Sequence, residues 1–186
     1  VDVVIVAGDV FDTASPPSHA REAYLQFALA VRDGGAQLVV LGGNHDSPAV
    51  LGEARSLLQR LHTWVVPSLD GEVADHVLCL PGRDGTPGML LCAVPFIRAR
   101  EVRSSLPGQD SEQRRQDMMA GIAAHYTAIH AHAVARRQAL GLALPIVAVL
   151  LVIALVFGAV VGYIVGRNSM VDRLQPHADT LKFAVD

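Results

Sequence analysis

Cysteine is scarce in this sequence, and its scarcity excludes one class of protein. Only Cys79 and Cys92 occur among the 186 residues, and each lies in a separate apolar run. Disulfide-stabilised domains need several cysteines, and zinc sites need cysteines at short, regular spacing. Neither pattern is present, so we expect both residues to be small buried side chains with free thiols in a reducing compartment.

The sequence also lacks internal repeats, low-complexity tracts and a secretory leader. It opens at Val1 with an apolar run typical of a buried strand, with no basic lead before it. We therefore expect a fragment without its natural N-terminus, without a signal peptide and located in the cytoplasm. The sequence has 186 residues, of which 51% are hydrophobic, and a net charge of -3. This length and composition predict one domain with a hydrophobic core.

Two apolar runs near the start predict strands buried on both faces. They are Val1–Ala7 and Gln37–Leu41, and each is followed by glycine. His19–Asp33 between them has apolar residues at helical spacing, and Ser18 is a candidate cap. A strand, a helix and a strand in this order predict a βαβ unit with parallel strands. The carboxyl ends of both strands then lie at one edge of a sheet, where α/β proteins bind ligands.

The remainder of the chain predicts further helices and strands. They are a helix over Pro48–Leu61, strands over Trp64–Val66, His76–Leu80, Met89–Pro95 and Pro145–Ala148, and a helix over Ser111–Leu140 ended by Gly141. The predicted class is α/β.

Polar residues suited to a metal site follow each of the first two strands. Gly8-Asp9 ends the first strand, and Gly43-Asn44-His45-Asp46 follows the second. Carboxylate and amide oxygens are hard ligands, and a carboxylate can bridge two metal ions that activate water beside a phosphoryl group. A histidine beside them can donate a proton near neutral pH. A lone Asp after a strand, such as Asp9, is more often a turn residue or a helix cap, but the two motifs together favour a site.

The surroundings of these motifs carry a family resemblance. The stretches GDVFDTASPPSHAREAY and LVVLGGNHDSPAVL are the main evidence, and Pro95-Phe96 and His125-Tyr126 extend it more loosely, to about Ala148. They resemble the calcineurin-like metallophosphoesterases and, within them, the SbcD-type nuclease subunits. The resemblance implies a β-sandwich flanked by helices. It also implies an enzyme, a metal-dependent double-strand DNA exonuclease and endonuclease that acts in repair and recombination.

The resemblance also implies residue roles and partners. Asp9 would bridge two manganese ions (with magnesium as the alternative), Asn44 would ligate one ion, and His45 would be catalytic. Asp12 and Asp46 would hold the motif loops. The partners would be DNA, an SbcC-type ATPase and a second copy of the chain.

The chain departs from the family pattern outside these two motifs. The family's Asp-x-His block would precede Val1, and its Gly-His and Gly-His-x-His blocks would follow Ala148, where they are absent. His130-Ala131-His132 does not replace them, because side chains two positions apart on a helix diverge. We therefore expect an N-terminally incomplete fold with a partial ligand set.

A long apolar run lies near the C-terminus. Ile146–Val165 holds no charged residue and would measure about 30 Å as a helix, enough to cross a bilayer. Small residues recur every four positions, as in packed membrane helices, at Ala154, Gly158, Gly162 and Gly166. We predict a partial nuclease domain over 1–145, an apolar helix with membrane contact over 146–167 and a polar tail over 168–186. The alternative for this run is a buried strand followed by a core helix.

Three functions remain open at this point. The first is the metal-dependent nuclease subunit, and the second is a membrane-anchored, catalytically inactive interaction fragment. The third is a phosphoesterase that acts on nucleotides or phosphoproteins. Residues 98–137 hold seven arginines against four acidic residues, which fits either DNA contact or a solvated helix face.

Overall fold

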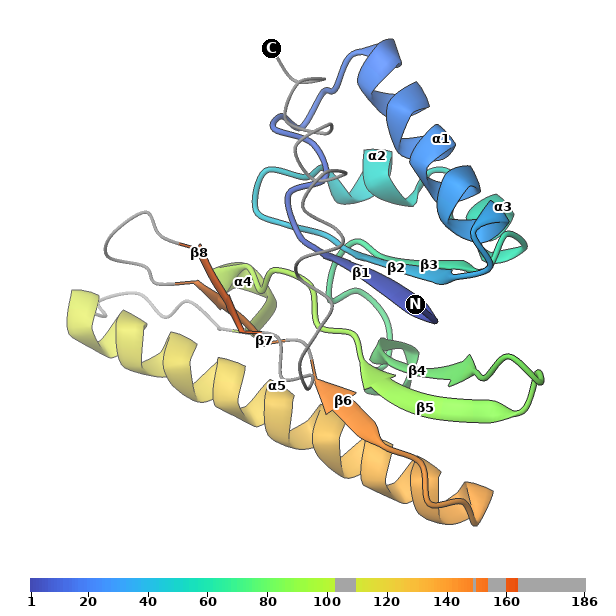
Figure 1. Cartoon of the computed structure of the whole chain (residues 1–186). Coiled ribbons are helices and arrows are strands. Elements are labelled where there is room, and N and C mark those ends of the chain that lie inside the picture. Colours follow the sequence, from blue (N-terminus) through green and yellow to red (C-terminus); the bar gives the residue numbers. More distant parts are fainter. Residues whose placement is uncertain (103–109, 149, 154–159, 164–186) are drawn as a thin grey trace.

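The computed structural model describes residues 1–102, 110–148, 150–153 and 160–163. Within them, two three-stranded sheets pack against each other, and helices cover their outer faces (Figure 1). The predicted α/β class, with a β-sandwich flanked by helices, is therefore confirmed.

The first sheet contains the predicted βαβ unit. Its strands β1 (Val3–Ala7), β2 (Gln37–Leu41) and β3 (Thr63–Val66) are all parallel and lie in that order. Helix α1 (Ser18–Asp33) joins β1 to β2. The helix begins at Ser18 itself and its N-cap residue is Pro17, so the prediction of Ser18 as the cap is wrong.

The predicted helix over Pro48–Leu61 is broken into two short helices. They are α2 (Pro48–Gly52) and α3 (Arg55–Gln59). The first ends at Gly52, and glycine is unfavourable inside a helix because it has the most backbone freedom to lose. Both pieces still bury a leucine against the first sheet, Leu51 from α2 and Leu58 from α3.

The second sheet is mixed. The strands predicted at His76–Leu80 and Met89–Pro95 are present as β4 (Val77–Pro81) and β5 (Pro87–Cys92). They form an antiparallel hairpin that follows a short 3₁₀ helix, η1 (Val73–His76). Strand β6 (Ile146–Ala148) pairs in parallel with β5. This confirms the expected strand at this position and extends the sheet beyond residue 145.

The alternation of side chains along β2 explains why the sheets and helices form layers. Val39 and Leu41 pack between the two sheets with Leu91 of β5, whereas Leu38 and Val40 pack beneath α1 and the two short helices. Successive residues of a strand point to opposite faces, so an unbroken apolar run requires cover on both sides. Each such fully buried side chain stabilises the fold by about 1.5–3 kcal/mol.

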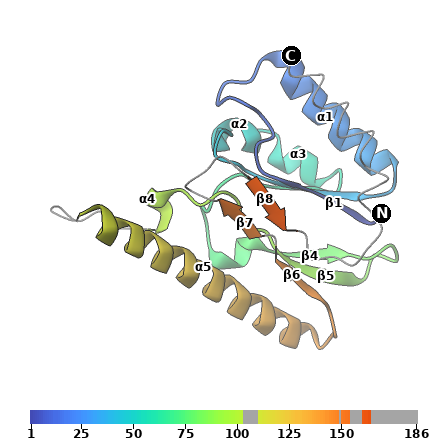
Figure 2. The same ribbon diagram turned by 60° about the vertical axis from the view of Figure 1, so that its left-hand side comes forward.

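Helix α5 (Ser111–Leu140) covers the outer face of the second sheet, on the side of the sandwich opposite α1 (Figure 2). The Asp110 carboxylate caps its start by accepting the Gln113 N–H at 2.8 Å. Its predicted end at Gly141 is confirmed, and the φ of that residue is +63°. A short helix not predicted from the sequence, α4 (Ala99–Val102), packs against α5.

The predicted apolar helix over 146–167 is wrong for the described residues. Residues 146–148 form β6, and β7 (Leu150–Ile153) pairs antiparallel with β8 (Val160–Tyr163). Valine and isoleucine dominate these segments, and β-branched side chains favour strands. No helix in the described residues is long and apolar enough to cross a membrane. Residues 154–159 and 164–186, with the predicted polar tail, lie outside the described part.

Candidate metal and catalytic site

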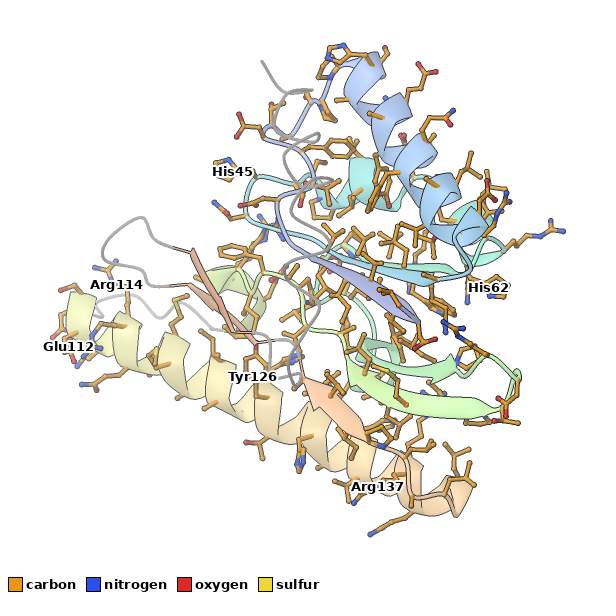
Figure 3. All side chains as sticks on the ribbon, in the orientation of Figure 1. His45, His62, Glu112, Arg114, Tyr126 and Arg137 are labelled. Carbon is orange, nitrogen blue, oxygen red and sulfur yellow. The ribbon has the colours of Figure 1, made fainter. Side chains whose placement is uncertain are left out.

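The two sequence motifs meet at one edge of the first sheet. Ala7 and Leu41 are paired residues of neighbouring parallel strands, so the loops after β1 and β2 leave the sheet side by side. Asp9 lies on the first loop and His45 on the second, and the His45 main-chain N–H donates to Asp9 Oδ1 at 3.2 Å. Figure 3 shows His45 at the outer edge of its loop. Asp9, Asn44 and His45 are all exposed, which leaves their side chains accessible to a ligand.

Asp9 holds a strained backbone conformation. Its φ is +48°, in the left-handed region that favours glycine, and it follows Gly8 at φ +96°. A left-handed non-glycine residue costs about 1–3 kcal/mol and persists only where its surroundings fix it.

One of those surroundings is Gly43 on the facing loop. A Cβ atom at Gly43 would lie 2.1 Å from both the main-chain nitrogen and Oδ1 of Asp9. No side chain fits in that space, so glycine at position 43 lets the two loops touch. The glycine before the Asn-His pair is therefore part of the site's geometry.

The Asn44 amide faces the Asp9 carboxylate. Its hydrogen bonds are satisfied with Nδ2 toward Asp9, at 3.2 Å from Oδ1 and 3.3 Å from Oδ2, while its oxygen accepts from His45 Nε2 at 3.2 Å. With the amide turned over, its oxygen would meet two carboxylate oxygens, and only a cation could make that contact favourable. Asp9, Asn44 and His45 thus form one contiguous group.

Asp46 fastens the two loops together. Its carboxylate accepts three main-chain N–H groups, from Val10 at 3.1 Å, Phe11 at 2.9 Å and Gly43 at 2.8 Å. The residue is only 2% exposed. The loop-holding role implied for Asp46 is therefore confirmed.

Tyr24 of α1 lies under these loops. Its ring packs edge-on against Phe11 at a centroid distance of 5.7 Å. Burial, and then the nearby negative charge of Asp46, raise the pKa of Tyr24 above its usual range. The hydroxyl therefore stays protonated, and Tyr24 adds no charge beneath the loops.

Arg98, which the sequence analysis counted only among the seven arginines of residues 98–137, contacts the second motif from behind. Its Nη2 donates to the main-chain oxygens of Gly43 at 3.3 Å and Asp46 at 3.0 Å. Position 98 carries no motif of its own, and its distance from residue 43 along the chain hid the contact. The one available signal was the nearby Pro95-Phe96, already part of the family resemblance.

Other candidate residues do not join the group. Asp12 is exposed and makes no hydrogen bond within the described residues, so the loop-holding role implied for it is wrong there. His130 and His132 lie on α5, and His125 of that helix packs against His76 at a ring-centroid distance of 6.0 Å. In the described part of the chain, no three His, Cys, Asp or Glu side chains gather as a metal cluster.

A hollow of about 480 Å³ adjoins the second motif turn. Ser47 and Pro48, which directly follow Asp46, line one side of it, and Arg55 and Arg100 contribute positive charge. Neither arginine has an ion-pair partner within the described residues. Acidic residues also line the hollow, so its charge is mixed.

Comparison with protein families settles the ancestry of this arrangement. Residues 1–132 match the family model described as calcineurin-like phosphoesterase. The chain belongs to the calcineurin-like phosphoesterase family. The match spans both motif turns, the whole first sheet, the β4–β5 hairpin and most of α5.

Within this family, the chain is similar to bacterial proteins named as the SbcD subunit of the nuclease SbcCD. The protein of Escherichia coli (strain K12) is 46% identical over 134 residues, which cover 72% of this chain and 32% of that protein. The Rhodobacter capsulatus protein is 31% identical over 158 residues, covering 80% and 37%. The Bacillus subtilis (strain 168) protein is 40% identical over 58 residues, covering 31% and 15%. The chain thus spans about a third of the length of its first curated relatives.

Proposed function

We propose that this chain is the nuclease subunit of a complex that hydrolyses phosphodiester bonds in double-stranded DNA with the help of a divalent metal. The observation that carries the proposal is the meeting of Asp9 with Asn44 and His45 at one sheet edge, on loops joined by buried Asp46. The similarity to proteins named as the SbcD subunit of a nuclease supports DNA as the substrate. The nuclease domain would comprise residues 1–145 together with β6.

The donor set of this corner suits a hard divalent metal. Asp9 offers a carboxylate, and Asn44 can turn its amide oxygen toward the same point. Manganese, with magnesium as the alternative, accepts such oxygen ligands and completes its coordination with water and phosphate oxygens. When bound, the metal supplies an activated water and neutralises charge on the phosphate. Asp9 would hold two such ions, and Asn44 would hold one of them.

The protein's own residues position and protonate the substrate. His45 is exposed beside Asp9 and Asn44, so its imidazole can contact the scissile phosphate and donate a proton to the leaving oxygen. If Asn44 held a metal through its amide oxygen, that oxygen would no longer accept the hydrogen bond from His45 Nε2. The His45 imidazole would then be available to the substrate.

The partners we propose are an SbcC-type ATPase, a second copy of this chain and DNA ends, in repair and recombination. The support is the name of the relatives, in which this type of chain is one part of a larger nuclease. Copurification of the chain with the ATPase, and its molar mass in solution, test the two protein partners.

Hydrolysis assays with several substrates test the proposal. With Mn²⁺, the chain should degrade linear duplex DNA in preference to a nucleotide or a phosphopeptide, and His45→Gln should abolish the activity. The matched control is His19→Gln, because His19 is exposed on α1 and outside the site. Faster hydrolysis of the nucleotide or phosphopeptide would indicate a phosphoesterase with that substrate and contradict the nuclease proposal. No hydrolysis at high Mn²⁺ would refute catalysis by this chain.

A further inference from the structure

We propose that Arg98 is a positioning residue, whose guanidinium holds the Gly43–Asp46 turn so that Asn44 and His45 face the site. Its effect on catalysis rests on the proposed function, whereas its hold on the turn does not.

The contacts of Arg98 span the motif. Nη2 donates to the main-chain oxygen of Gly43 at 3.3 Å and to that of Asp46 at 3.0 Å. These two carbonyl groups lie on either side of Asn44 and His45 in the chain, and both of those side chains are exposed. The guanidinium therefore ties the two ends of the turn together without touching the residues that carry the chemistry.

Asp46 holds the same turn through different atoms. Its carboxylate binds the Gly43 N–H group, whereas Arg98 binds the Gly43 carbonyl group. The peptide units on both sides of Gly43 are thus fixed independently, one by an anion and the other by a cation. With the Asp9 contact that excludes a Cβ at Gly43, the turn is restrained from three directions.

Arg98 is itself firmly anchored. Glu101 accepts the Arg98 main-chain N–H at 2.7 Å, and its other oxygen lies 3.8 Å from Nη1. The guanidinium lies over the Phe96 ring, 5.7 Å from its centroid, and the Phe96 N–H donates to the Gly42 oxygen at 2.8 Å. The segment that carries Arg98 therefore runs directly alongside the motif loop.

The energetic cost of burying the Arg98–Glu101 ion pair indicates that Arg98 does more than fill space. The side chains of Arg98 and Glu101 are only 16% and 12% exposed, and Nη1 of Arg98 is buried without a hydrogen bond in the described residues. Burying an ion pair costs desolvation energy, and apolar side chains of similar size are often as stable or more so. An apolar residue could fill the space, but it could not donate to two carbonyl groups.

Amide hydrogen exchange on the metal-free chain tests whether Arg98 restrains the Gly43–Asp46 turn. In Arg98→Ala, the amides of Gly43 and His45 should exchange about tenfold faster, as expected from the loss of an anchoring hydrogen bond, while that of Val40 in β2 is unchanged. Glu101→Gln should show a smaller increase at the same amides. The control Arg32→Ala removes an exposed arginine at the far end of α1 and should change neither. Unchanged exchange in the turn, or an equal increase at Val40, overturns the proposal.

Metal binding and kinetics test the consequence. Mn²⁺ affinity, measured by calorimetry on the full chain, should fall about 10–100-fold in Arg98→Ala, as for other residues that orient ligands. For hydrolysis of bis(p-nitrophenyl) phosphate, kcat should fall by a similar factor while KM changes less than about twofold. Arg98→Lys should keep the fold and recover part of the loss, because an ammonium can donate but lacks the planar fork.

The outcomes separate the two proposals. Faster exchange in the turn with unchanged Mn²⁺ affinity and kcat would overturn the positioning role. A wild-type chain that neither binds Mn²⁺ nor hydrolyses the diester would refute the proposed function, and hydrogen exchange would still decide whether Arg98 holds the turn.

Discussion

The Asp46 carboxylate accepts the main-chain N–H of Phe11 at 2.9 Å, across 35 positions of sequence. Through this bond and its companions, one buried side chain joins the loop that carries Asp9 to the loop that carries Asn44 and His45. The two motifs are therefore one structural unit, and most of the predictions below follow from that unit.

Replacing Asp46 should destabilise the fold as well as the site. Asp46→Ala leaves three main-chain N–H groups without their acceptor, and we expect a loss of about 3 kcal/mol in the free energy of unfolding. Urea unfolding measures this quantity. Asp33→Ala, which removes an exposed aspartate at the end of α1, should leave it unchanged. Equal stability of Asp46→Ala and wild type would contradict the role assigned to Asp46.

A methyl group at position 43 should push the two loops apart. In Gly43→Ala the new Cβ would overlap Asp9, so we expect a destabilisation of about 1–3 kcal/mol and a weaker Mn²⁺ site. Thermal unfolding and Mn²⁺ titration measure the two effects. Gly34→Ala is the matched control, because its Cβ meets nothing closer than 3.4 Å and its φ is -72°. If both variants behave alike, the close approach of the loops is not required.

The packed pair of His76, which is buried, and His125, which is partly buried, should make the fold sensitive to acid. Burial lowers the pKa of His76, and burial together with His76 lowers that of His125. Below about pH 6.5, the unfolded chain binds protons that the folded chain does not, so stability should fall as the pH drops from 7 to 5. His125→Gln should reduce the loss of unfolding free energy between pH 7 and pH 5. His130→Gln, which replaces an exposed histidine on the same helix, should leave that loss unchanged. Urea unfolding at pH 7 and pH 5.5 measures the free energy of unfolding. An equal decrease in the wild type and in both variants would exclude the histidine pair as the cause.

The sequence predicted the first sheet and the site better than it predicted the C-terminal region. Val3–Ala7 and Gln37–Leu41 are apolar on both faces and end at glycines, so strand type and the shared edge followed from local pattern alone. Leu150–Ile153 is a strand that pairs with Val160–Tyr163, and a tertiary partner of this kind is invisible in a hydrophobic run. Length and glycine spacing therefore favoured a helix where the described residues form strands.

The same distinction applies within the site. Asp9, Asn44 and His45 were found because each lies next to a glycine-marked strand end. Arg98 was not found as a functional residue, because its contact with the motif joins segments more than fifty positions apart. Asp12 shows the reverse error, since proximity to a motif suggested a role that its exposed side chain does not fill.

The most direct test of the central claim, that this sheet edge is a metal site, is calorimetric titration of the chain with Mn²⁺. The wild type should bind Mn²⁺, and Asp9→Ala should lose that binding because it removes the carboxylate at the centre of the group. Asp12→Ala, which removes an exposed aspartate from the same loop, should bind as tightly as wild type. Equal binding by Asp9→Ala and Asp12→Ala would contradict the account.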